Sequence, residues 1–248
     1  MPTPLETIRA LEVRAFNAWP ALETIAAEGW LCRFASGYTK RANSVNALAP
    51  AVPVPEILRI AAPLYAARAL PLVFRLSPLA GPEADAALAA LGFQILDASI
   101  VMTAPVQSKM AGERDVSIAA RPQTAWSAGF AAANRVAVAH RETHDRMLAA
   151  IQCPTAFAAL ESEERPIAWG LGVAEHGMVG LFDIVTAPEA RRQGAARSLV
   201  RALLAWGYTQ DARAAYLQVV ASNAPAIALY RSLGFVEAYR YHYRVRRP

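Results

Sequence analysis

The sequence has few cysteines and no long apolar run, and each scarcity excludes a class of protein. Cys32 and Cys153 are the two cysteines among 248 residues, and they lack the paired spacing of a zinc site or a disulfide framework. We therefore expect no metal, a reducing cytoplasmic location, and two cysteines that serve as small buried hydrophobes. No apolar run approaches the roughly 20 residues of a membrane span, and the N-terminus lacks the basic start and apolar core of a secretion signal.

Two phosphate-binding signatures are also missing. No glycine-rich loop ends in Gly-Lys-Ser or Gly-Lys-Thr, which excludes a P-loop, and no GxGxxG is present, which excludes the dinucleotide fingerprint. The charged fraction is low, at 18%, whereas 55% of the residues are hydrophobic, so the composition argues against disorder. The length allows one large domain or two small ones, each with a proper core.

The net charge of +5 is concentrated at the end of the chain. The last nine residues, Arg240–Pro248, contain four arginines and no acid. Such a basic segment with interleaved tyrosines could contact nucleic acid, or it could be a strand whose arginines face water or a phosphorylated cofactor. We expect neither a nucleic-acid nor a membrane partner.

The stretch Leu181–Leu204 combines an apolar strand, a turn rich in arginine, and a helix. Small residues around Gly194 leave backbone amides uncovered, so that an anion can approach them closely. The helix that follows adds unpaired amides and the positive end of its dipole. Arg191, Arg192 and Arg197 supply charge that can pair with phosphate oxygens. The composition predicts a phosphate-binding turn; the alternative is an ordinary strand–loop–helix crossover whose arginines face water.

Two motifs in this part of the chain have the order and spacing of a known family. The first is the turn Arg191-Arg192-Gln193-Gly194-Ala195-Ala196, and the second runs from Tyr216 to Phe235 as strand, Asn223, helix and Leu-Gly-Phe. They resemble the acetyl-CoA motif and the second motif of the GNAT family of N-acetyltransferases. The resemblance implies an α+β fold, with a mixed, mostly antiparallel sheet flanked by helices. It also implies acetyl-CoA as the co-substrate.

By this resemblance, Ile184, Val185 and Thr186 bind the pantetheine arm through backbone groups left without a strand partner. The other expected cofactor-binding residues are Arg191, Arg192, Gln193, Gly194, Ala195, Ala196, Arg197, Ser198, Asn223, Ala226 and Tyr230. Tyr230 matches the tyrosine that protonates the departing thiolate, a general-acid role; the alternative is a core tyrosine of its helix. Asn223 is also a plausible cap of that helix.

The position of the general base departs from the family pattern. The ribosomal-protein alanine acetyltransferases have a glutamate five residues before the asparagine, where this sequence has Gln218, which cannot accept a proton. Asp183, in the middle of an apolar strand, is the expected catalytic replacement. Burying a carboxylate there costs free energy, which a functional role would explain. A structural hydrogen-bond acceptor is the alternative. His140, Glu142 and His144 on one predicted helix are further candidates, and a water chain would need no dedicated base.

The two halves of the chain are similar at an offset of 142 residues. Leu91-Gly92-Phe93 matches Leu233-Gly234-Phe235, and the predicted helix Glu56–Arg68 matches Ser198–Gln210. In place of the arginine-rich turn the first copy has Ala49–Val54, which contains prolines and neither glycine nor arginine. We therefore expect a tandem GNAT arrangement in which only the second copy binds acetyl-CoA.

The expected domains are residues 1–105, a degenerate GNAT-like copy; residues 106–115, a polar linker; and residues 116–248, the catalytic domain. Within the first domain we expect a helix that reaches Glu28 and a polar strand over Thr39–Leu48. We expect this strand to help wall the acceptor pocket; a solvated edge strand is the alternative.

The expected activity is transfer of an acetyl group from acetyl-CoA to a primary amine by direct attack on the thioester. The acceptor is expected to be a small molecule or a peptide, and the protein a monomer or homodimer. Two other readings remain. One is a non-catalytic CoA-binding sensor, which Gln218 favours and Tyr230 opposes. The other is a nucleic-acid-binding protein that uses the basic tail.

Overall fold

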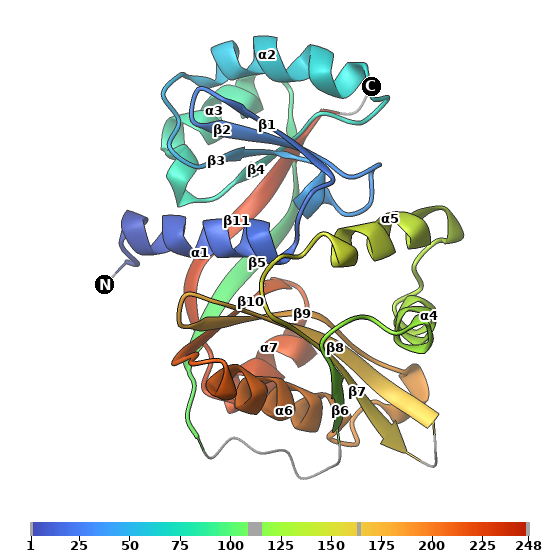
Figure 1. The fold of residues 1–248 in the computed structure, drawn as a ribbon. Helices are drawn as coiled ribbons and strands as arrows, with labels where there is room; N and C mark the ends of the chain where they lie inside the picture. Colours follow the sequence, from blue (N-terminus) through green and yellow to red (C-terminus); the bar gives the residue numbers. More distant parts are fainter. Residues whose placement is uncertain (1, 109–115, 163–164, 247–248) are drawn as a thin grey trace. The chain divides into compact units, whose positions relative to one another are not determined.

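The structure is a computed structural model that describes residues 2–108, 116–162 and 165–246 (Figure 1). By contacts the chain divides into two compact units. The first comprises Met1–Val101, Val219–Asn223 and Glu237–Pro248, and the second comprises Met102–Gln218 and Ala224–Val236. Most of the expected linker, residues 109–115, lies outside the described residues.

The first unit is a mixed sheet flanked by helices. Its strands, in order across the sheet, are β1 (Glu23–Ala27), β2 (Trp30–Phe34), β3 (Val45–Ala47), β4 (Val73–Leu76) and β11 (Val236–Val245). Neighbours are antiparallel except β3 and β4, which are parallel. The helices are α1 (Leu5–Ala18), α2 (Val54–Ala66) and α3 (Pro82–Ala90), and β5 (Gln94–Pro105) follows with residues in both units. The parallel pair requires a crossover, and α2 provides it.

The second unit has the same kind of sheet. Its strands, in order across the sheet, are β10 (Ala214–Val220), β9 (Met178–Thr186), β8 (Arg165–Glu175), β7 (Thr155–Ser162) and β6 (Val116–Ala119). Neighbours are antiparallel except β9 and β10, which are parallel and are joined by α6. The helices are α4 (Thr124–Ala133), α5 (Val138–Ala149), α6 (Ala195–Thr209) and α7 (Ala224–Ser232). Both units are therefore α+β, as the sequence predicted.

Helices cover both faces of the second sheet. A Cβ added to Gly129 of α4 would lie 2.6 Å from the indole ring of Trp169, so α4 packs against that side chain. A Cβ added to Gly170 would lie 3.0 Å from Leu199 of α6, so α6 packs against the next residue of β8. Since adjacent positions on a strand face opposite ways, α4 and α6 cover opposite faces. In Figure 1, α6 and α7 lie together on one side of these strands.

From α2 onward, the elements of the two halves coincide at the 142-residue offset. Helix α3 corresponds to α7 residue for residue, and β4 falls within the positions of β10. In each half a helix joins a parallel strand pair, since α2 follows β3 and α6 follows β9. The repeat recognised in the sequence is thus a repeat of supersecondary structure.

Two segments of the first unit differ from the expectation. The helix expected to reach Glu28 is strand β1, because pairing with β2 outweighs its local propensity. Only Val45–Ala47 of the expected strand Thr39–Leu48 is extended, and Lys40–Ala42 form a 3-10 turn. Asn43 holds this turn, because its Oδ1 accepts from the Ala35 amide at 2.8 Å and its side-chain amide donates to nearby carbonyls. Strand β3 lies between β2 and β4, so it is not an edge strand.

Residues 240–245 of the basic tail lie in β11, and by contacts this strand belongs to the first unit from Glu237 onward, whereas the sequence placed residues 116–248 in one domain. The physical reason is its antiparallel pairing with β4, which the sequence did not reveal. Two of its arginines are engaged by carboxylates: Arg244 donates to Asp85 at 2.8 Å, and Arg240 donates to Glu237 at 2.7 Å. These contacts support a strand with paired arginines over a nucleic-acid-binding arm.

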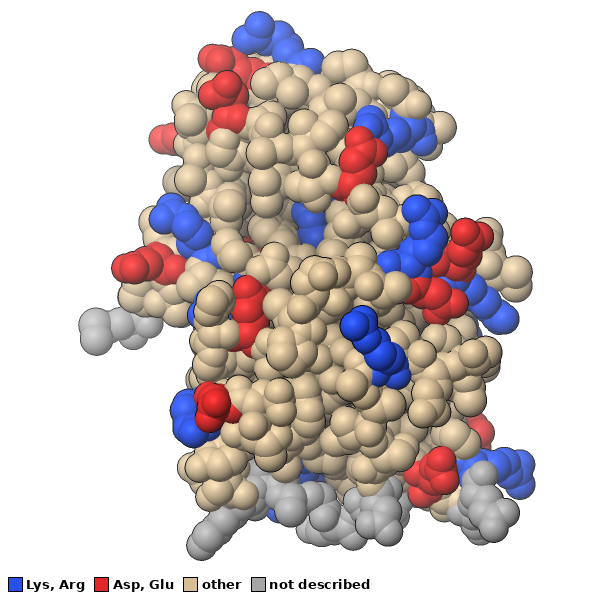
Figure 2. Space-filling view, viewed as in Figure 1, with Lys and Arg blue, Asp and Glu red and all other residues tan. Residues whose placement is uncertain are grey.

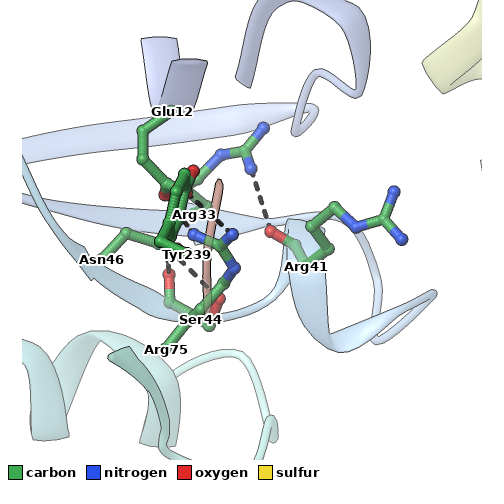
Figure 3. A network of polar contacts seen from close by, with 7 residues as sticks. All are labelled: Glu12, Arg33, Arg41, Ser44, Asn46, Arg75 and Tyr239. Atoms are coloured by element: carbon green, nitrogen blue, oxygen red, sulfur yellow. Dashed lines mark hydrogen bonds and ion pairs between the residues drawn. The ribbon is translucent and has the colours of Figure 1, made fainter. Parts of the chain in front are cut away.

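A charged network is buried in the first unit (Figure 3). Glu12 of α1 accepts hydrogen bonds from Arg75 of β4 and from the Tyr239 hydroxyl of β11, and its side chain is fully buried. Burial lowers the pKa of Arg75, but the Glu12 carboxylate outweighs it and raises that pKa well above its ordinary value. Arg33 donates to the Arg41 carbonyl at 2.9 Å, and burial with two neighbouring arginines lowers its pKa to about 9. The network ties the first helix to the last strand.

Several expectations from composition can be compared with the structure. Cys32 is buried, whereas Cys153 is only half-buried. Among the described residues, no helix is long and apolar enough to cross a bilayer. Figure 2 shows positive and negative side chains interspersed over the face that it draws, without a broad patch of one sign. On that face the charge therefore offers no extended basic surface for a nucleic-acid backbone.

Candidate functional site

Strands β9 and β10 separate part-way along the second sheet. Within the described residues, their parallel register runs from Met178 to Leu181 on β9 and ends there. Beyond that point β9 stays paired with β8 as far as Thr186. Residues 179–182 are buried, but residues 183–186 are half-exposed. The edge of β9 that faced β10 is therefore open along the segment expected to hold a pantetheine arm, and its backbone groups are left for a ligand.

Asp183 lies at a β-bulge where the separation begins. Leu171 is opposite Phe182 and Trp169 is opposite Val185, so β9 has one residue more than β8 over this interval. Asp183 has a φ of +50°, in the left-handed region that aspartate tolerates better than most residues. The acid in this apolar strand therefore has a conformational reason to be there as well as a chemical one.

The turn before α6 presents a row of free backbone amides. Arg191 N–H bonds the Pro188 carbonyl, and Ser198 N–H bonds the Gly194 carbonyl at 3.1 Å. Within the described part of the chain, the amides in between, from Arg192 to Arg197, have no hydrogen-bond partner. Such a row at the positive end of a helix dipole is an anion-binding arrangement. The phosphate site stays a prediction, and these amides are the backbone groups that it would use.

Gly194 gives this turn its shape. Its φ of +82° lies in the left-handed region, and it directly precedes the first residue of α6. A Cβ built on it would meet no protein atom within 4 Å, so the space beside its backbone is open. An anion can therefore approach the backbone closely at this point.

The side chains of the turn are exposed and partly tethered. Arg191 donates through Nε to the Thr186 carbonyl at 3.4 Å, and Gln193 donates to the Glu189 carbonyl at 3.0 Å. Arg197 reaches across to Ser232 at the end of α7, with 2.9 Å between Nη2 and Oγ. The Gln193 side chain bonds within the turn, and Arg191 and Arg197 are exposed on either side of it. Exposed guanidinium groups can pair with an anion that binds to the backbone amides.

Tyr230 is mostly buried on α7. Its side chain is 8% exposed, and its ring packs at a steep angle against Phe235 with centroids 5.9 Å apart. Burial raises the pKa of the hydroxyl to about 12, and at neutral pH the group carries its proton, as a tyrosine of ordinary pKa also does. This is the state that a general acid needs. The packing also fits the alternative role as a core tyrosine, and the position of the side chain does not distinguish the two roles.

Asp183 has a partner that the sequence did not assign to it. His144 of α5 lies with Nε2 2.8 Å from the Asp183 Oδ2. The imidazole is 1% exposed and the carboxylate side chain 10% exposed. His144 was one of three weaker candidates on its helix, and the structure brings this one to the carboxylate. Its position three residues before Met147, on the buried side of α5, was the signal available in the sequence.

The remaining expected residues flank these groups. Ser198 and Ala195 are buried at the start of α6, and Ala226 lies in the first turn of α7. Asn223 directly precedes α7 but belongs to the first unit by its contacts. Gln218 follows the last β10 residue that is in register with β9, so it stands where the two strands separate.

The equivalent turn of the first half is closed by its own chain. The amides of Leu48 and Ala49 donate to the Gly29 carbonyl, and that of Ala51 donates to the Glu28 carbonyl at 2.9 Å. Pro53 takes the place before the helix, and it has no N–H. This turn therefore offers few amides and no guanidinium group to an anion.

Comparison with known proteins shows which family the chain resembles. Residues 6–244 match a family model described as "Probable histone acetyltransferase Rv0428c C-terminal". A Bacillus subtilis (strain 168) protein named "Uncharacterized N-acetyltransferase YobR" is 29% identical over 98% of this chain and 100% of its own length.

Solved structures show the same fold at low sequence identity. A GCN5-related N-acetyltransferase from Kribbella flavida superposes with a TM-score of 0.71 at 17% identity, over 97% of this chain and 95% of that one. A tandem GNAT protein from the clavulanic acid biosynthesis pathway has a TM-score of 0.60 at 14% identity, over 77% of this chain and 69% of that one.

Proposed function

Because the chain belongs to this GNAT-type N-acetyltransferase family, we propose that it transfers an acetyl group from acetyl-CoA to a primary amine of a small molecule or peptide. The observation that carries the proposal is the coincidence of two features in one unit. The row of free amides from Arg192 to Arg197 can take a diphosphate, and the open edge of β9 can take an extended chain. Coenzyme A joins these two chemical groups in one molecule.

In this arrangement the pyrophosphate lies on the amides beside Gly194, with Arg191, Arg192 and Arg197 around it. The pantetheine arm extends along Ile184–Thr186, which lie beyond the part of β9 that pairs with β10. Backbone groups near Val185 then polarise the thioester carbonyl. The first half does not hold a second coenzyme, because its equivalent turn is closed by the β1–β2 turn.

The reaction is direct attack without a covalent enzyme intermediate. The acceptor ammonium loses a proton to Asp183, and the free amine forms a C–N bond to the thioester carbon. The C–S bond then breaks, and Tyr230 donates its proton to the departing sulfur. The nitrogen loses its second proton to water as the amide forms, and water returns a proton to the Tyr230 oxygen. Asp183 takes the role of base because Gln218, at the family's glutamate position, cannot accept a proton.

The test is release of free thiol from acetyl-CoA in the presence of a panel of amines. We expect thiol release that depends on one class of amine. Tyr230→Phe should lower turnover by about 10²-fold, at the low end of general-acid effects, with unchanged acetyl-CoA affinity. Tyr208→Phe, on α6, is the matched control and should leave turnover unchanged.

A non-catalytic coenzyme sensor is distinguished by the same assay. A sensor would bind acetyl-CoA, as measured by calorimetry, and release no thiol with any amine. Unchanged turnover in Tyr230→Phe would remove that residue from the mechanism without removing the activity. Thermal stabilisation by DNA instead of acetyl-CoA would contradict both readings.

A further inference from the structure

His144 and Asp183 come from elements far apart in the sequence and meet inside the second unit. The contact joins Nε2 of a buried imidazole to Oδ2 of the bulge residue, at 2.8 Å. An ionised carboxylate has no hydrogen to donate, so the hydrogen of this contact is on Nε2. Phe130 of α4 lies against the imidazole with ring centroids 4.9 Å apart. The imidazole is therefore held on one side by a ring of α4 and on another by the carboxylate to which it donates.

The second oxygen of this carboxylate is not engaged by the protein. In the described part of the chain, Asp183 Oδ1 has no hydrogen-bond partner. This oxygen is not enclosed, and the side chain as a whole keeps 10% of its exposure. Asp183 directly precedes Ile184–Thr186, where β9 continues beyond its pairing with β10. One oxygen is thus fixed by a donor, and the other stays accessible beside the open edge of the strand.

His144 is the ionisable side chain that α5 directs into the unit. It lies with Thr143, Met147 and Leu148 on the buried side of the helix. The other ionisable side chains of α5 are half-exposed or exposed: His140, Arg141, Glu142, Asp145 and Arg146. A core histidine with a satisfied hydrogen bond would have the same burial, so the contact with Asp183 is what points to a role.

We propose that His144 is a positioning residue: by donating from Nε2 to Oδ2, it holds the Asp183 carboxylate so that Oδ1 takes the proton of the acceptor ammonium. This role rests on the proposed acetyltransferase function. The ammonium hydrogen moves to Oδ1, its electron pair stays on the nitrogen, and His144 keeps its own proton throughout. The terminal torsion of aspartate is broad, so without the donor the carboxylate could turn and the accepting oxygen would lose its fixed place.

Two substitutions at position 144 separate positioning from packing. His144→Leu removes the donor, whereas His144→Gln keeps an N–H donor at the end of its side chain. With the amine that gives thiol release, His144→Leu should lower kcat by about 10–100-fold, because a misplaced reacting group loses rate steeply, and the KM for acetyl-CoA should not change. His144→Gln should restore most of this rate. His176→Gln, in the β8–β9 turn with 79% of its side chain exposed, is the control and should match wild type.

The same substitution is then measured in Asp183→Asn, where asparagine suits the left-handed φ of the bulge. Because His144 acts through Asp183, His144→Leu should change the remaining rate by less than about twofold in this background. An active wild type with no loss in His144→Leu, or with the same loss in both backgrounds, overturns the positioning role alone. Equal losses in His144→Leu and His144→Gln also overturn it.

Crystal structures of the two variants test the positioning without turnover. We expect the Asp183 carboxylate to keep its orientation in His144→Gln and to turn in His144→Leu. An unchanged carboxylate in His144→Leu would overturn the inference whatever the activity. Absence of thiol release with every amine would overturn the acetyltransferase function and this role together.

Discussion

The turns that precede α2 and α6 occupy equivalent places in the two halves, but their backbone amides face different partners. In the first half, Ala49 and Ala51 donate to carbonyls of the β1–β2 turn, and prolines remove further donors. In the second half, the described amides from Arg192 to Arg197 have no partner in the protein. In the same supersecondary unit, the turn amides are thus bonded within the chain in one copy and lack a protein partner in the described part of the other.

The two halves also differ in how they use arginine. The first unit buries Arg33 and Arg75, and the latter is paired with Glu12. The second unit leaves Arg191 and Arg192 exposed at the mouth of the turn. Buried guanidinium groups are held by partners within the protein, whereas exposed ones beside free amides are available to an anion. The two buried arginines of the first unit thus lie inside its fold, whereas those of the turn before α6 face solvent.

The largest expected effect concerns the buried arginine. Glu12→Gln leaves the Arg75 charge without its carboxylate, and breaking a buried pair costs about 3–5 kcal/mol. We expect a marked fall in the denaturant midpoint of the first unit, measured by urea unfolding. Glu6→Gln, at an exposed position on the same helix, is the control. Equal midpoints for the two variants would show that the first unit does not depend on its buried charges.

The second effect concerns the open turn. Gly194→Ala places a Cβ where the diphosphate approaches and strains a left-handed residue, so acetyl-CoA affinity should fall by about 30-fold, or about 2 kcal/mol. Gly177→Ala has the same strain, since its φ is +74° and its surroundings are equally open, but it lies in the β8–β9 turn. Calorimetry should show weakened binding in the first variant only, and equal affinities would separate the coenzyme from this turn.

A smaller effect is expected from the exposed arginines. Arg191→Gln removes a charge near the phosphates and should weaken acetyl-CoA binding by about tenfold at low salt. Added salt should reduce the difference, because the guanidinium is exposed. Arg59→Gln on α2, at an exposed position of the closed half, should have no effect on affinity. A salt-independent loss, or an equal loss in both variants, would contradict this role.

The smallest effect is on stability against pH in the first unit. The Arg244 guanidinium bonded to Asp85, with His242 beside it, holds the pKa of that carboxyl down, at about 2. A lowered pKa stabilises the fold above the unfolded value near 4 and loses that contribution as pH falls toward 2. Because Asp85 is more than a third exposed, Asp85→Asn should lower the thermal midpoint at pH 7 by only about 2 °C. The difference from wild type should vanish near pH 2 in calorimetric scans, and a constant difference would exclude the ion pair as its source.

The local motifs could be predicted from the sequence because their determinants are local. Gly194 before an amphipathic helix was enough to locate the turn, and Leu-Gly-Phe at two positions was enough to align α3 with α7. Strand β1 was misassigned, because its five residues favour neither structure until β2 pairs with them. The place of β11 beside β4 could not be predicted, since β11 and β4 are separated by most of the chain.

The sequence pointed to the turn at Gly194, but it revealed less about the surroundings of Asp183. The small residues and arginines around Gly194 predict a phosphate-binding turn from composition alone. By contrast, the end of the β9–β10 register and the bulge at Asp183 depend on how three strands pair. The contact of His144 with Asp183 depends further on the tertiary position of α5. The sequence could place His144 on the buried side of its helix, but it could not show which residue the imidazole meets.

The most direct test is a crystal structure of the chain soaked with acetyl-CoA. We expect one coenzyme per chain, with its diphosphate on the amides between Arg192 and Arg197 and its pantetheine arm along Ile184–Thr186. A coenzyme bound at Ala49–Val54, in addition or instead, would contradict the distinction drawn between the two halves.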